Sequence, residues 1–304
     1  MKYIPKFDIG YGLHVPKGFN RLLDRNGEFN VIHTNRPIQF RDVYHYLINT
    51  TWSHFFLWIL LGYFVVSLLF ALVYLAIGIE HLQGITSGSI IDNTLYSFYF
   101  STQTFTTVGY GYISPTGHLT SLVASFEALF GLLFFSFGTG LLYGRFSRAK
   151  PNLKFSKNMY WRDFREGKAL MFRLMHKHPN VLMDLEAEVY LSLKIDAENG
   201  LELKYYSIEI ERSKLSLLPL TWTIVIPIDE KSPMYQWTEE DFKNNSGEFI
   251  ILIKYFDETF SQMIYQRYSY LLEEIRFNQV FRPAHIYNLE GTAILDHEML
   301  DTVV

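Results

Sequence analysis

The stretch Thr106-Thr-Val-Gly-Tyr-Gly111 lies between two long apolar segments of this 304-residue chain. Its glycines allow backbone conformations that other residues rarely adopt, so that successive carbonyl oxygens can face one axis. Such carbonyls can replace the water around a potassium ion, and the Thr107 hydroxyl can add ligands at the inner end. Val108 and Tyr110 can point away and pack against neighbouring helices. The expected ion-binding residues are Thr107, Val108, Gly109, Tyr110 and Gly111, with K+ at the first four.

Two apolar segments flank this stretch and predict membrane-spanning helices. Residues 55–79 carry no charge, and residues 118–144 are interrupted only by Glu127. At a rise of about 1.5 Å per residue, either segment can cross the hydrocarbon core of a bilayer. Because one chain supplies only one side of an ion cage, four subunits must converge on a shared axis.

The connector between the spans is too polar to be a third span. Residues 93–105 suit a short re-entrant helix, with Asp92 or Asn93 as its N-cap. Irregular backbone at membrane depth is tolerated only where protein or water surrounds it, so the segment after this helix should line a pore. The partly negative helix C-terminus near Thr106 would favour a cation in the central cavity.

The positive charges predict the topology of this membrane domain. No Lys or Arg occurs between Asp42 and Gly144, whereas basic residues are frequent on both sides. This positive-inside pattern predicts both termini in the cytoplasm and a location in the cell's inner membrane. Residues 1–40 are expected to form an irregular arm and residues 41–52 a helix on the inner membrane surface, although a simple aqueous lead-in is an alternative. The two-span pore domain should cover residues 53–150.

The remaining residues, 151–304, predict a cytoplasmic β-sandwich. Apolar segments alternate with turn signals, as expected for short strands with breaks between them. The expected strands are 169–175, 189–195, 201–210, 221–228 and 249–256.

Composition and motifs argue against several other classes of protein. The net charge of −4 gives no indication of nucleic-acid binding, and the absence of Cys excludes disulfides and thiolate metal sites. No Walker loop, zinc-protease motif or dinucleotide fingerprint is present, and the Ser-x-x-Lys string Ser147-Arg-Ala-Lys150 has no second motif beside it, so neither catalysis nor a cofactor is expected. His176 and His178 would share one face of a strand and could bind a metal, but the neighbouring Pro179-Asn180 favours a surface turn.

Several stretches resemble the inward-rectifier potassium channels. They are Asp42-Val-Tyr-His-Tyr-Leu-Ile-Asn-Thr-Thr-Trp52, Thr221-Trp-Thr-Ile-Val-Ile-Pro-Ile-Asp229, Ser232-Pro-Met-Tyr235, Asp257-Glu-Thr-Phe-Ser-Gln262 and Tyr268-Ser-Tyr270. The resemblance implies an immunoglobulin-like cytoplasmic sandwich whose homotetramer extends the pore. Eukaryotic members carry two extracellular cysteines around the filter. This chain has none, which favours the prokaryotic branch.

The second span contains the residues expected to control the pore. Gly131, Phe135, Thr139 and Tyr143 recur every four residues and could share the pore-facing side of the helix. By resemblance, Gly131 is a hinge and Tyr143 a constriction, whereas packing between helices is the alternative. Glu127 is expected either to make a structural hydrogen bond behind the filter or to act directly in conduction.

Charged residues outside the spans suggest binding partners. Arg145, Arg148 and Lys150 leave the membrane at its anionic inner face, where they either bind lipid or only set topology. By resemblance, Glu186 and Glu274 face the cytoplasmic pore and concentrate cations, and the alternative is a pair of solvated surface carboxylates. Phe135 has no charge at a cavity position that is acidic in strong rectifiers. We therefore expect weak block by internal Mg2+ and polyamines, and block by Ba2+ in the filter.

Together these features predict a tetrameric, potassium-selective channel of the inward-rectifier type, gated at the inner helices and the cytoplasmic domain. One alternative is a membrane-tethered sandwich that binds a ligand, but an anchor needs neither a filter nor a glycine-bearing second span. Another is a potassium-transport subunit, but such proteins usually carry several pore repeats and this chain has one.

Overall fold

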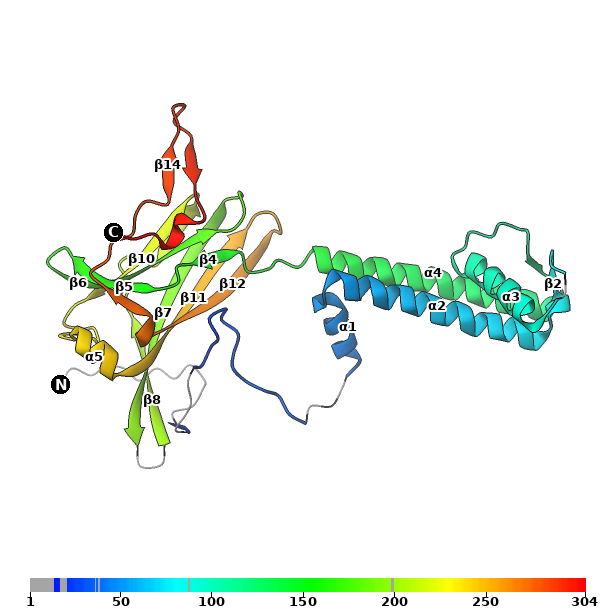
Figure 1. The fold of residues 1–304 in the computed structure, drawn as a ribbon, viewed down its shortest axis with the longest axis horizontal. Helices are drawn as coiled ribbons and strands as arrows, with labels where there is room; N and C mark the ends of the chain where they lie inside the picture. The colour runs from blue at the N-terminus through cyan, green and yellow to red at the C-terminus, as the bar shows by residue number, and fades with distance from the viewer. Residues whose placement is uncertain (1–13, 17–20, 36, 38, 87, 198–199) are drawn as a thin grey trace. The chain divides into compact units, whose positions relative to one another are not determined.

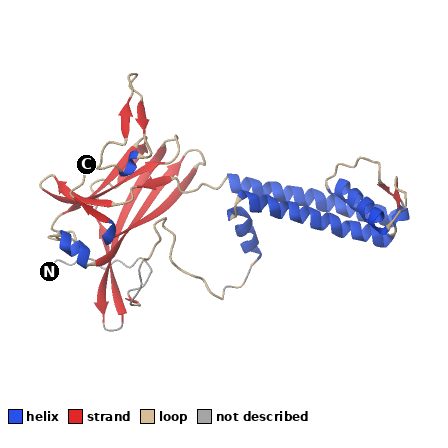
Figure 2. Cartoon of the chain, viewed as in Figure 1, coloured by secondary structure: helices blue, strands red, loops and turns tan. Residues whose placement is uncertain are grey.

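A computed structural model describes residues 14–16, 21–35, 37, 39–86, 88–197 and 200–304 (Figure 1). The chain divides into two compact units. One spans Asn35–Arg148 and is helical, whereas the other combines the chain up to Thr34 with Ala149–Val304 and is built mainly from strands (Figure 2).

Among its described residues, the helical unit contains two helices long and apolar enough to cross a membrane. They are α2, Trp52–Ile77, and α4, His118–Phe146. A shorter helix precedes them and another lies between them: α1, Phe40–Asn49, and α3, Ile90–Phe105. Packing between α2, α3 and α4 buries Tyr74, Phe100 and Ala124, and the short strands β2, Leu82–Gln83, and β3, Ser114–Pro115, pair antiparallel.

Several helix boundaries differ from the sequence prediction, and the structure gives the cause for two of them. The interfacial helix was expected to run to Trp52 but ends at Asn49, because Thr50 and Thr51 are extended and the Thr51 hydroxyl caps α2. The re-entrant helix begins at Ile90 rather than residue 93. Its cap is Ser89, whose hydroxyl accepts the Asp92 N–H at 3.2 Å while the Asp92 carboxylate accepts the Ser89 N–H at 3.2 Å. Assigning the cap to Asp92 or Asn93 was therefore wrong.

The second unit is a sandwich of two sheets. Among the described residues, one sheet has the order β1-β8-β7-β11-β12 with β9 paired to β7, and the other has the order β10-β6-β5-β13 with β4 paired to β6. The strands are β1, His14–Val15; β4, Leu153–Phe155; β5, Met159–Phe164; β6, Gly167–His176; β7, Leu182–Ala197; β8, Gly200–Ile208; β9, Lys214–Leu218; β10, Thr221–Ile228; β11, Ser246–Asp257; β12, Gln262–Leu271; and β13, Ile275–Phe277. The large apolar core lies between the sheets and includes Phe172, Ile224 and Phe249. A short helix, α5, Glu239–Asn244, follows β10.

Part of the N-terminal arm belongs to this sandwich. Leu22 and Leu23 are buried against Leu203, Tyr205 and Ile250 of the larger sheet. The sequence predicts an irregular cytoplasmic arm over residues 1–40, and the structure adds that Leu22 and Leu23 of this arm pack against the sandwich. Residues 1–13, 17–20, 36 and 38 of that prediction lie outside the described residues.

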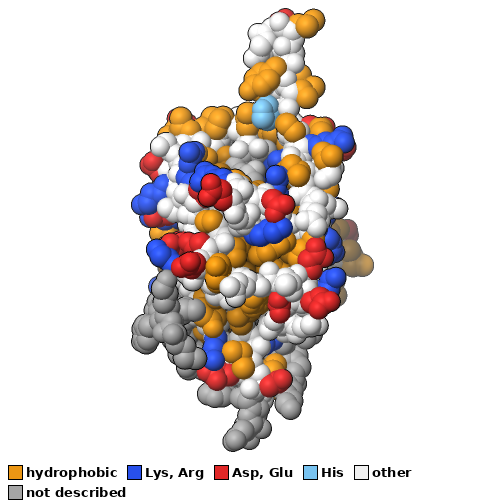
Figure 3. All heavy atoms as spheres, turned by 90° about the vertical axis from the view of Figure 1, so that its left-hand side faces the viewer, with side chains coloured by type: hydrophobic (Ala, Val, Ile, Leu, Met, Phe, Trp, Pro, Cys, Tyr) orange, Lys and Arg blue, Asp and Glu red, His pale blue; other side chains and the backbone are white. Residues whose placement is uncertain are grey.

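A hairpin near the C-terminus projects from the sandwich. It consists of β14, His285–Tyr287, and β15, Ala293–Leu295, and carries exposed apolar side chains including Ile286 and Leu289 (Figure 3). A two-stranded hairpin is marginally stable alone. Its base is fixed by a small cluster in which Ala284 and Leu295 pack with Met175 and Leu300.

Candidate ion-conduction site

The filter stretch follows the last turn of α3 and alternates in backbone conformation. Thr107, Gly109 and Gly111 have positive φ angles of 59°, 55° and 75°, whereas Val108 and Tyr110 between them do not. A positive φ disfavours an ordinary side chain, which explains two of the glycines. Alternation between positive and ordinary φ angles turns successive carbonyls toward the same side of the chain. This is the geometry that a column of carbonyl ligands requires.

Alternate residues of the filter also lie against different surroundings. Thr107, Gly109 and Gly111 border a pocket of about 400 Å³ beside Phe100 and Ala128. Val108 and Tyr110 border another pocket, of about 550 Å³, beside Tyr99 and Thr102 of α3. The sequence predicts that Val108 and Tyr110 pack against the re-entrant helices. In the single chain they remain exposed, so a neighbouring subunit would have to complete that packing.

Gln103 contributes to the filter in a way that the sequence analysis missed. Its backbone carbonyl accepts the Gly109 N–H at 3.1 Å, and its side-chain amide donates to the Ile113 carbonyl at 3.1 Å. One residue of the last turn of α3 therefore holds both the middle of the filter and the segment beyond it. A glutamine six residues before a filter glycine is only a weak sequence signal for this role, because most glutamines in proteins simply face solvent.

Glu127 of α4 is buried between three helices. It is fully buried, accepts a hydrogen bond from the Tyr74 hydroxyl at 2.6 Å and accepts another from Ser101. The three residues belong to α4, α2 and α3, so this carboxyl joins the two long helices to the helix that leads into the filter. The arrangement favours the structural interpretation of Glu127 over a direct role in conduction.

Replacing Glu127 separates these two interpretations. Glu127→Gln should keep potassium flux within about twofold of the native chain, because the amide oxygen can accept from one hydroxyl while the amide N–H donates to the other. Glu127→Leu leaves two buried hydroxyls without an acceptor, at about 1–3 kcal/mol each, and should lower flux and tetramer yield at least tenfold. Both are measured by rubidium uptake into liposomes and size-exclusion chromatography. Loss of flux with an intact Gln tetramer would instead assign the carboxyl's charge a role in conduction.

The four residues predicted to share the pore-facing side of α4 do not share one environment. Phe135, Thr139 and Tyr143 are exposed in the single chain, with Tyr143 72% exposed, whereas Gly131 is buried. A Cβ atom at Gly131 would lie 1.8 Å from the Phe105 carbonyl oxygen at the end of α3. Close approach of α4 to the filter helix therefore explains this glycine without any bend, and its role as a hinge stays a prediction.

The cations predicted to meet lipid also differ in environment. The Arg145 guanidinium donates to the Leu47 carbonyl at 2.6 Å and to the Thr50 carbonyl at 2.7 Å, and lies 4.4 Å from the ring centre of Trp52. These bonds satisfy orphan carbonyls at the C-terminus of α1 and fix α1 to α4. Arg145 is therefore engaged within the chain. Arg148 is exposed although it donates to the Asn49 side chain, and Lys150 is exposed.

Glu186, one of the two acids predicted to face the cytoplasmic pore, is paired. Its carboxylate lies 3.0 Å from the Lys214 ammonium and 3.7 Å from that of Lys254. The hydrogen bond from Lys214, with the charge of both lysines, holds the pKa of Glu186 below its usual value. The carboxylate is therefore neither free nor simply solvated.

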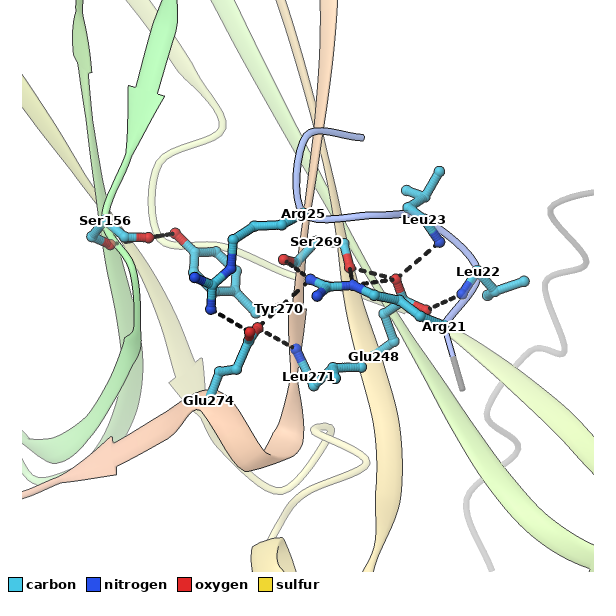
Figure 4. Close-up of polar contacts among 10 residues, drawn as sticks. All are labelled: Arg21, Leu22, Leu23, Arg25, Ser156, Glu248, Ser269, Tyr270, Leu271 and Glu274. Atoms are coloured by element: carbon cyan, nitrogen blue, oxygen red, sulfur yellow. Dashed lines mark hydrogen bonds and ion pairs between the residues drawn. The ribbon is translucent and has the colours of Figure 1, made fainter. Parts of the chain in front are cut away.

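Glu274, the other predicted pore acid, joins the N-terminal arm to the sandwich (Figure 4). It forms ion pairs with Arg25 and, at 3.6 Å, with Arg21, and accepts the Leu271 N–H at 2.9 Å. Nearby, Glu248 of β11 accepts the backbone N–H groups of Leu22 at 2.7 Å and Leu23 at 3.2 Å. Two guanidinium groups therefore offset the charge of Glu274, which weakens its predicted attraction for pore cations.

The predicted histidine pair is partly buried. His176 ends β6 with an exposed fraction of 3%, and its Nδ1 lies 3.0 Å from the Asn180 carbonyl oxygen, while His178 is exposed. Burial lowers the pKa of His176. No group of three or more metal-ligating side chains lies within the described residues, so the metal interpretation of this pair gains no support.

Comparison with known proteins bears on both units. A family model for ion channels matches residues 53–147, and a model for the inward rectifier potassium channel C-terminal domain matches residues 153–304. The inward rectifier potassium channel Kirbac3.1 of Paramagnetospirillum magnetotacticum is 33% identical over 94% of this chain and 96% of its own length. The chain belongs to the inward-rectifier potassium-channel family. It is therefore a membrane protein and a potassium channel, not an enzyme, and a homotetramer is consistent with that family.

More distant relatives are similar over most of this channel subunit. The inward rectifier potassium channel irk-1 of Caenorhabditis elegans is 25% identical over 92% of this chain, but only 56% of the worm protein is covered. The ATP-sensitive inward rectifier potassium channel 12 of Gallus gallus is 25% identical, with 87% of this chain and 67% of the chicken protein covered. The greater likeness to the bacterial relative supports the prokaryotic branch predicted from the missing cysteines.

Proposed function

We propose that four copies of this subunit surround one potassium pathway, with Thr107 to Gly111 as its selectivity filter. The observation that carries this proposal is the alternation of positive φ at Thr107, Gly109 and Gly111, directly after a helix whose C-terminus favours a cation. Purified protein in liposomes should pass potassium and rubidium, largely exclude sodium and be blocked by barium. Equal sodium and potassium fluxes would refute the filter assignment.

The gate in this proposal lies on the cytoplasmic half of α4. Phe135, Thr139 and Tyr143 are exposed in the single chain and occur at four-residue spacing, so four copies would place their side chains around one axis. Four Tyr143 rings near the inner membrane surface can close and dewet a pore. In this proposal both termini lie in the cytoplasm and the chain in the inner membrane, as the positive-inside pattern of Lys and Arg indicates.

The lipid contact in this proposal involves Arg148 and Lys150 rather than all three predicted cations. Both are exposed, and each is worth about 1 kcal/mol of attraction to an anionic leaflet. Arg145 instead holds the C-terminus of α1 through the carbonyls of Leu47 and Thr50. Anionic lipid would therefore act close to a helix that is fixed to the gate-bearing α4.

Block by internal polyamines should be weak in the native channel. Phe135 brings no charge to the cavity, and the carboxylates of Glu186 and Glu274 are paired with cations. Phe135→Asp should increase spermine block at least tenfold and steepen its voltage dependence, because the blocker would then bind deeper in the membrane field. Macroscopic currents with spermine on the cytoplasmic side measure this, and Phe135→Asn is the uncharged control. Strong rectification of the native channel would contradict the prediction, as would equal block of both variants.

A further inference from the structure

Beyond the filter, the chain pairs with the segment that follows α2. Strands β2 and β3 are antiparallel, with Leu82 opposite Pro115, and the Thr116 N–H donates to the His81 carbonyl at 2.8 Å. Figure 1 shows β2 at the end of the helical unit away from α1. A two-stranded ribbon of this length is not stable alone, so other contacts must hold it in place.

The apolar side chains in and next to this ribbon are anchored between the helices. Leu82 and Ile113 are 3% and 5% exposed, and they pack with Tyr74 of α2, Phe100 of α3 and Ala124 of α4. Both segments therefore share one core with all three helices. Displacing either segment would open a cavity in that core, so the chain after α2 forms a fixed wall beside the filter exit.

Gly84 brings this wall against Tyr112, the residue that directly follows the proposed filter. A Cβ atom on Gly84 would lie 1.8 Å from the Tyr112 carbonyl oxygen and 2.9 Å from its carbonyl carbon, so a side chain there is incompatible with the approach. Gly84 also has a φ of 94°, which disfavours other residues. On the same segment, the Gln103 amide donates to the Ile113 carbonyl at 3.1 Å. The filter exit is therefore held between α3 and the chain after α2.

We propose that Gly84 is a positioning residue for potassium selectivity, because its approach to Tyr112 sets where the outer end of the filter lies. The Gly111 carbonyl belongs to the planar peptide that joins Gly111 to Tyr112, so a shift of Tyr112 moves the last filter carbonyl with it. Selectivity depends on the number and arrangement of such carbonyls. Gly84 itself contacts no ion and acts only through Tyr112. This role of Gly84 rests on the proposed function of Thr107 to Gly111 as the filter.

Gly84→Ala and Gly78→Ala together test this role. Both glycines have positive φ in the chain after α2, but the three atoms nearest to a Cβ on Gly78 belong to the flexible Glu80 side chain. Both changes therefore add backbone strain, but only Gly84→Ala meets the backbone of the filter exit. The permeability ratio of potassium to sodium, from bi-ionic reversal potentials, should fall about tenfold or more in Gly84→Ala. In Gly78→Ala it should stay within about twofold of the native ratio.

The outcomes separate the filter assignment from the role of Gly84. A selective native channel with an unchanged ratio in Gly84→Ala would overturn the positioning role alone. An equal fall in both variants would assign the loss to backbone strain and would also overturn that role. A native channel that does not distinguish the two ions would refute the filter, and the role of Gly84 with it.

Further variants keep the test decisive if Gly84→Ala does not form tetramers. Mixed tetramers with native subunits contain fewer clashes, and their permeability ratio should fall as the share of the variant rises. Because the chain lacks Cys, Gln83→Cys with Ser114→Cys allows a disulfide across the ribbon, where these two residues lie opposite each other. Oxidation should leave the ratio within about twofold, because the ribbon keeps this register while the channel conducts. A larger change that reverses on reduction would show that the ribbon moves, and would overturn the role of Gly84.

Discussion

Gly131→Ala should abolish channel function through loss of assembly rather than through altered gating. The added Cβ would lie 1.8 Å from the Phe105 carbonyl oxygen and 2.8 Å from its carbonyl carbon. These are backbone atoms of the last turn of α3, so no flexible side chain can move aside. Overpacking costs about 1–3 kcal/mol or more per site. The clash would occur in every subunit, at Phe105 just before the filter. Rubidium uptake should therefore fall at least tenfold together with tetramer yield.

The matched control lies on the same helix. A Cβ at Gly140 would meet nothing within 4 Å in the described chain, so Gly140→Ala should assemble normally and retain flux. Alanine also favours helix by about 1 kcal/mol over glycine. A stable Gly131→Ala tetramer with normal yield and only altered opening would contradict close approach and would restore the hinge interpretation.

Gly109→Ala should abolish selective conduction while leaving the rest of the subunit folded. Gly109 has a φ of 55°, and a Cβ there would meet nothing within 4 Å, so backbone conformation rather than space requires the glycine. An L-residue in this region costs about 1–2 kcal/mol, and each tetramer would contain the change four times. Relief of the strain would rotate carbonyls away from the axis. We expect at least a tenfold loss of rubidium uptake and a fall in the preference for potassium over sodium.

Gly117→Ala separates filter geometry from general backbone strain. Gly117 also has a positive φ, 81°, but it lies at the start of α4 outside the filter. This variant should lose yield without losing the preference for potassium over sodium, measured on the tetramers that form. An unchanged preference in Gly109→Ala would show that the Gly109 carbonyl is not part of the selective cage.

The elements that the sequence predicted well are those with a strong local signal. Apolar length located α2 and α4, and β10 has the predicted bounds of Thr221–Ile228 because turn residues flank it. Boundaries were less predictable where several polar residues could act as caps. Ser89, Asp92 and Asn93 are all suitable N-caps, and only the reciprocal bonds between Ser89 and Asp92 identify the cap.

The contacts that could not be predicted join residues far apart in the sequence. Glu127 was recognised as a carboxyl in a span, but its donors Tyr74 and Ser101 lie on other helices and carry no signal of their own. The pairing of Glu274 with Arg21 and Arg25 spans most of the chain, so an acid with a predicted pore role is partly neutralised by the arm. Local patterns give the type of an element, whereas such pairs depend on how elements pack.

The central claim is that the segment from Thr107 to Gly111 distinguishes potassium from sodium, and the bi-ionic reversal potential tests it most directly. Purified tetramers are fused into a planar bilayer with potassium chloride on one side and sodium chloride on the other. Each tenfold preference shifts the reversal potential by about 59 mV toward the potassium equilibrium potential. The filter geometry predicts a shift of at least about 59 mV, abolished in Gly109→Ala. A reversal potential near zero for the native channel would contradict the account.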